Sequence, residues 1–247
     1  MKKLLKPNTL PAVTAGLGGI ALVLRRLTYL FAVDEKGLLI AHHPLLIALW
    51  GLTAIALVYI LLNVRRLDGS NDYADNFRAS TPSAVGHVLA ASGLAVTVLF
   101  NRPFMDGYLG TAWTALGYAS PVCLLLAGFA RMGGRKPCFL LYLVPSLFLV
   151  IHIIDHYQVW CGNPQIQDYI FTLFGTMALM LFAFYNAAFS VGLGKRRMQM
   201  GTGLAAAFLC MAELAVSRYP YLYLGGIVWA LTSLCSPYPQ PKRAEEG

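Results

Sequence analysis

The sequence predicts an all-α protein, a polytopic transmembrane helix bundle of about eight membrane-spanning helices. Of the 247 residues, 57% are hydrophobic and only 12% are charged, about half the charged share of a typical soluble domain. Apolar stretches recur along the chain, each near the roughly 20 residues that a spanning helix needs. The basic residues behind the net charge of +8 lie in small clusters between these stretches, a pattern that indicates membrane topology and not nucleic-acid binding.

Eight apolar segments follow one another, and each is expected to form a spanning helix. They are residues 10–33, 43–64, 83–100, 108–130, 138–160, 169–193, 201–216 and 221–236. The first follows a basic start, but no small-residue cleavage site closes it, so we expect a retained helix and not a signal peptide. The last two are short and are joined by a tight Tyr219-Pro220-Tyr221 break, so a re-entrant pair is the alternative there.

Lys and Arg set the expected orientation. With a cytoplasmic N-terminus, only five of the 19 Lys and Arg residues lie outside, namely Arg25, Arg26, Lys36, Arg102 and Arg218. Cytoplasmic loops carry the basic excess, so we expect both termini on the cytoplasmic side of the cytoplasmic (inner) membrane, with the lipid bilayer as the main partner. The connections are too short for a second domain. We therefore expect one transmembrane domain over 1–236 and a disordered cytoplasmic tail over 237–247, which is rich in Pro and charge.

A weak internal similarity suggests a 4+4 duplication. Gly86-His-Val-Leu-Ala-Ala resembles Gly201-Thr-Gly-Leu-Ala-Ala, and Leu49-Trp-Gly resembles Leu173-Phe-Gly, each pair four segments apart. Parallel repeats of this kind occur in some transporters, although apolar sequences also produce such matches by chance.

The densest polar cluster inside an apolar segment is His152-Ile-Ile-Asp155-His156. The spacing i, i+3 and i+4 puts the three side chains on one helical face. Charged groups in a bilayer are costly and usually face a protein interior or a watery cavity. Because the expected topology puts these residues in the outer half of their helix, we predict an outward-facing polar cavity there.

Glu213, Arg25 and Arg26 fall in the same leaflet. Small residues along the face of Glu213 allow a neighbouring helix to approach closely, so we expect Glu213 to point into the bundle and to meet Arg25, Arg26 or a histidine of the 138–160 segment. The alternatives are purely structural roles: the two arginines reach the outer headgroups, and Asp155 only pairs with an arginine to join helices.

Aromatic residues near the segment ends are expected to form interfacial belts. They are Tyr108, Trp160, Tyr219, Tyr221, Tyr223 and Tyr238.

Two cofactor interpretations use the same histidines. His152 and His156 at i, i+4, with Asp155, would suit a divalent metal such as zinc, but the His-Glu-x-x-His protease pattern is absent. A single haem held by His43 and His156 is the less favoured alternative, since His42-His43 before Pro44 better fits a helix-entry turn.

Three functions follow. The first is a membrane protein that binds or transports a small polar solute or ion, with His152, Asp155, His156 and Glu213 lining the cavity and Arg25 or Arg26 compensating charge. The second is a membrane-embedded metal-dependent enzyme with the same ligands. The third is a structural or accessory subunit whose polar residues only join helices.

Overall fold

The computed structural model describes residues 9–33, 39–40, 42–65, 67, 71–160 and 169–235. These residues form nine helices, and their only β-type contact is an isolated bridge between Val33 and Leu39. The helices are α1 (Thr9–Phe31), α2 (Pro44–Val64), α3 (Tyr73–Asn76), α4 (Thr81–Phe100), α5 (Gly107–Met132), α6 (Leu140–Trp160), α7 (Ile170–Ser190), α8 (Arg196–Leu214) and α9 (Pro220–Leu234). The predicted all-α bundle is confirmed. The 237–247 tail lies outside the described residues.

Each of the eight predicted segments contains one long helix, and the short α3 lies in the connection between the second and third segments. Among the described residues, six helices are long and apolar enough to cross a membrane, namely α1, α2, α4, α5, α6 and α7. The other two differ for separate reasons. Helix α8 begins with Arg196 and Arg197, and α9 has only 15 residues, which span about 22 Å, less than the hydrocarbon core.

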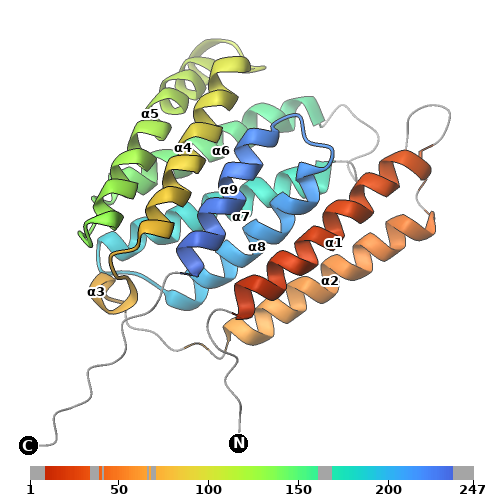
Figure 1. Ribbon diagram of the computed structural model, residues 1–247. Coiled ribbons are helices and arrows are strands. Elements are labelled where there is room, and N and C mark those ends of the chain that lie inside the picture. The colour runs from red at the N-terminus through yellow and green to blue at the C-terminus, as the bar shows by residue number, and fades with distance from the viewer. Residues whose placement is uncertain are drawn as a thin grey trace, which may run out of the picture.

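Helices α4 to α9 form a closed ring, because each contacts the next along the chain and α9 returns to α4. Helices α1 and α2 form a hairpin on the outside of this ring, where both contact α8 (Figure 1). The predicted 4+4 duplication is not visible in these contacts. Helix α1 packs on α8, whereas α6, its expected counterpart, packs on α5 and α7.

The helices run up and down between two ends of the bundle. Helix α1 begins and α9 ends at the same end, near α3 (Figure 1). We name this the Arg131 end, after the buried arginine in the last turn of α5. The connections from α4 to α5 and from α8 to α9 lie at the opposite end, which we name the Tyr219 end.

Glycine allows α4 and α9 to pack backbone against backbone. A Cβ atom on Gly93 would collide with the carbonyl oxygen of Tyr221, and one on Gly225 would lie 2.9 Å from the Cα of Ala90. Small residues permit such close approach between membrane helices. This contact fixes where α9 begins, and with it the position of Tyr219.

Candidate functional site

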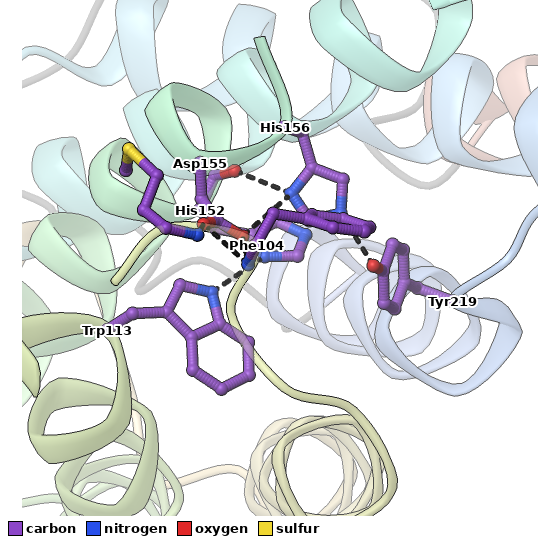
Figure 2. A network of polar contacts seen from close by, with 7 residues as sticks. Phe104, Trp113, His152, Asp155, His156 and Tyr219 are labelled. Carbon is purple, nitrogen blue, oxygen red and sulfur yellow. Dashed lines mark hydrogen bonds and ion pairs between the residues drawn. The ribbon is translucent and has the colours of Figure 1, made fainter. Parts of the chain in front are cut away.

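The polar face of α6 lies inside the bundle near the Tyr219 end. His152, Asp155 and His156 are all buried, with exposed fractions of 2%, 0% and 4%. Their spacing places them on one side of the helix, and Figure 2 shows them directed toward the α4–α5 connection, α5 and the start of α9. The structure thus brings the three predicted residues into one network.

Asp155 binds backbone amides. Its carboxylate accepts hydrogen bonds from the amide of Phe104 at 2.9 and 3.1 Å and from the amide of Met105 at 2.8 Å (Figure 2). These amides belong to the connection between α4 and α5. Hydrogen bonds to a charged acceptor are among the stronger ones in proteins. The carboxylate therefore ties this connection to α6, a partnership that the sequence did not reveal.

The two histidines have separate partners. The indole N–H of Trp113 donates to Nδ1 of His152 at 3.2 Å, and Nε2 of His156 lies 2.6 Å from the hydroxyl of Tyr219. Tyr219 lies in the connection between α8 and α9, where burial raises its pKa to about 12. The phenol donates to Nε2 of His156 in the tautomer whose Nδ1 carries the proton, which is the tautomer that the carbonyl oxygen beside Nδ1 requires. The Nδ1–H of His156 then donates to the carbonyl oxygen of His152 at 2.8 Å.

These contacts give no support to the metal and haem interpretations. Nδ1 of His152 and Nε2 of His156 are already hydrogen-bonded. In the part of the chain that the structure describes, no group of three or more His, Cys, Asp or Glu side chains is placed to hold a metal ion. The side chain of His43 accepts from the amide of Leu45 as the N-cap of α2, which is the helix-entry role considered for it.

A polar cavity of about 220 Å³ lies next to this network. Its lining residues come from α1, α6, α7, α8 and the two connections at the Tyr219 end, and they are Tyr29, Phe104, His156, Tyr169, Thr172, Glu213, Val216, Ser217, Arg218 and Tyr219. Of the four residues predicted to line a cavity, His156 and Glu213 line this one, whereas His152 and Asp155 are not among its lining residues. Glu213 is 5% exposed, so its carboxylate forms part of the buried wall.

Arg218 was not among the predicted site residues, although it lines this cavity. Its side chain is exposed, and its guanidinium lies 4.9 Å from the ring centre of Phe104 and 5.9 Å from that of Tyr219. Cations favour the faces of aromatic rings at such distances. The only sequence signal was its position just after a short apolar segment. A basic residue there is equally expected if it only helps to orient the helix in the membrane.

The structure separates Arg25 from Arg26. Arg25 is fully buried, and its guanidinium lies 4.9 Å from the ring centre of Tyr29 and 5.0 Å from that of Phe171. Arg26 is exposed. Because Tyr29 lines the cavity, Arg25 lies directly behind the cavity wall, where it can offset negative charge. Arg26 has the surface position that the structural alternative expected for both arginines.

Two of the predicted belt tyrosines are interior residues instead. Tyr219 is 4% exposed and bonds to His156, and Tyr223 is fully buried with its hydroxyl 2.9 Å from that of Thr176. Tyr108 and Tyr221 are 97% and 57% exposed, as a belt position requires. Tyr238 and the side chain of Trp160 lie outside the described residues.

A second buried network, which the sequence did not indicate, surrounds His87. Its Nε2 lies 3.0 Å from the indole nitrogen of Trp229 and 3.0 Å from the hydroxyl of Tyr142, and its Nδ1 lies 2.6 Å from the carbonyl oxygen of Ser83. Arg131 donates to the hydroxyl of Tyr73 and lies near that of Ser83. This network joins α4, α5, α6 and α9, toward the Arg131 end of the ring.

In comparisons with protein-family models, curated proteins and solved structures, nothing matches this chain.

Proposed function

We propose that this multi-pass membrane protein binds, and moves across the membrane, a small polar solute or ion that enters the cavity at the Tyr219 end. The observation that carries the proposal is that Glu213 from α8, His156 from α6, and Arg218 and Tyr219 from the α8–α9 connection line one polar cavity. Ionisable residues inside a membrane domain are costly and are typical of solute or ion pathways.

The size and chemistry of the cavity favour a small solute. A volume of about 220 Å³ equals roughly seven waters of liquid and is below the usual range for drug-sized ligands. A carboxylate, a guanidinium and several hydroxyl groups surround this space. They can bind opposite charges and hydrogen-bonding groups within one molecule.

The direction of the cavity follows from the basic residues. Arg65, Arg131, Arg135, Lys195 and Arg196 lie at or near the helix ends on the Arg131 side of the bundle. Cytoplasmic connections carry the excess of Lys and Arg. We therefore propose that the Arg131 end, where α1 begins and α9 ends, faces the cytoplasm and that the cavity faces outward.

Thermal unfolding of the purified protein tests the proposal with glycine betaine, choline and acetate, which represent zwitterionic, cationic and anionic solutes. We expect one of the three to raise the unfolding temperature of the wild type, because a ligand at 100-fold excess over its Kd stabilises a protein by about 2.7 kcal/mol. Glu213→Gln should remove this shift, whereas Asp75→Asn, at an exposed position on α3, should keep it. If no solute shifts the wild type and Glu213→Gln only lowers stability, the accessory-subunit function is correct instead.

A further inference from the structure

A second hollow, almost wholly apolar, lies between α2, α7 and α8. This apolar groove has a volume of about 370 Å³. Its lining includes Trp50, Leu57, Phe171, Phe174, Ala205 and Leu209. Leu57 and Phe174 are 39% and 49% exposed, so the groove is open along its side. Because α2 and α7 are both candidate membrane spans, that open side faces lipid.

The apolar groove and the polar cavity are linked by a series of side-chain contacts that runs through Arg25. Trp50 and Phe171, which both line the groove, are stacked with ring centres 5.4 Å apart. The guanidinium of Arg25 lies 5.0 Å from the ring centre of Phe171 and 4.9 Å from that of Tyr29. Tyr29 in turn lines the polar cavity.

The two hollows also follow one another along α8 and α7. On α8, Ala205 and Leu209 line the groove, and Glu213 lines the cavity. Residues four apart share a helical face, so this face is apolar toward the middle of α8 and acidic near its end. On α7, the groove side runs from Ile170 to Leu181, about 17 Å at the usual rise per residue. That is roughly half the hydrocarbon thickness of a bilayer, the depth of one leaflet.

From this arrangement we infer that the substrate is an amphiphile, with a zwitterionic head in the polar cavity and a single acyl chain in the apolar groove. The inference rests on the proposed function and specifies its solute. Glu213 and the aromatic faces of the cavity suit an ammonium group, and the guanidinium of Arg218 suits a phosphate. The groove offers the chain apolar contacts within the leaflet that the head already occupies.

Native mass spectrometry of the purified full-length protein tests this with three probes. Lysophosphatidylcholine carries head and chain, glycerophosphocholine carries the head alone, and a fatty acid carries the chain without the ammonium. We expect one lysophosphatidylcholine per protein, bound at least about tenfold more tightly than glycerophosphocholine, since each buried methylene adds favourable free energy. The fatty acid should bind more weakly than lysophosphatidylcholine.

Two groove variants isolate the contribution of the chain. Ala205→Phe fills the groove from α8, and Leu57→Trp fills it from its open side without disturbing a buried side chain. Both should reduce lysophosphatidylcholine affinity to that of glycerophosphocholine and leave the latter unchanged. Ala119→Phe, at an exposed position on α5, is the control and should bind as the wild type does.

The possible outcomes distinguish a failure of this inference from a failure of the proposed function. Unchanged lysophosphatidylcholine binding in both groove variants would show that the acyl chain does not lie in the groove. A fatty acid that binds as tightly as lysophosphatidylcholine would show that the zwitterionic head is not recognised. Either result overturns the inference. If glycerophosphocholine binds in a manner sensitive to Glu213→Gln but the chain adds nothing, the polar-solute function stands and only the amphiphile is wrong. If neither probe binds, the amphiphile is wrong, and the polar-solute function fails as well only if glycine betaine, choline and acetate also leave the unfolding temperature of the wild type unchanged.

Discussion

Single side chains on the polar face of α6 have different tasks. Asp155 holds the α4–α5 connection through two backbone amides, and His152 accepts from the indole of Trp113. His156 alone reaches the cavity. The side chains of Asp155 and His152 therefore join α6 to the α4–α5 connection and to α5, whereas His156 lines the cavity.

Replacing Asp155 by Asn should destabilise the protein without changing any residue that lines the cavity. The amide of Asn has one acceptor oxygen and turns its NH₂ group toward a backbone N–H, so at least one hydrogen bond to a charged group is lost, a cost of about 1.5–3 kcal/mol. Thermal unfolding in detergent measures this. Asp106→Asn in the same connection is the control, because Asp106 is exposed and its side chain caps no helix. Equal stability of the two variants would contradict the role given to Asp155.

For these residues, the sequence could predict which helical face they share but not which groups they form hydrogen bonds with. The i, i+3, i+4 spacing was sufficient to place His152, Asp155 and His156 on one face. It could not identify Trp113 or the amides of Phe104 and Met105, because these lie 39 to 51 residues away along the chain. Tyr219 was misjudged for the same reason: a tyrosine at a helix end resembles a belt residue unless its contact with His156 is known.

Among the helices, the contact between α4 and α9 is the most closely packed part of the ring. Gly93 faces the carbonyl oxygen of Tyr221, and Gly225 faces the Cα of Ala90. The positions of Tyr219 and of the cavity depend on this contact, since Tyr219 directly precedes α9.

Gly93→Ala should therefore push α4 and α9 apart. The added methyl group meets backbone, which cannot rotate away as a side chain can, and overpacking of this kind costs about 1–3 kcal/mol. Unfolding temperature and solute binding should fall together. Gly51→Ala, on α2 with nothing within 4 Å of the new Cβ, should be neutral or slightly stabilising, since Ala favours helix by about 1 kcal/mol. A Gly93→Ala variant as stable as Gly51→Ala would show that the two helices do not pack this closely.

The helices themselves were largely predictable because apolar length is a direct physical requirement for crossing a bilayer. The eight predicted segments each contain one helix of at least 15 residues, and the doubt over the last two corresponds to the polar start of α8 and the short length of α9. Helix α3 was not expected, since four residues within a polar connection leave no periodic pattern. The order of the helices around the ring could not be predicted from the sequence either, because apolar helices can pack against many neighbours.

Across the whole molecule, polar chemistry is gathered toward the two ends of a six-helix ring. The cavity with Glu213 and His156 lies at the Tyr219 end, and the network of His87 and Arg131 lies toward the other. Between them lies a void of only about 10 Å³, whose lining includes Leu94, Leu149 and Leu179.

Cysteine accessibility in intact cells tests the outward-facing cavity most directly. Ser217→Cys lines the cavity and Ala79→Cys lies in an exposed connection near the Arg131 end; each is made in a background with Cys138, Cys161 and Cys235 replaced by serine. A membrane-impermeant maleimide should label Ser217→Cys in intact cells and Ala79→Cys only after the membrane is opened. Labelling of Ala79→Cys in intact cells, or no labelling of Ser217→Cys before the membrane is opened, would contradict an outward-facing polar cavity.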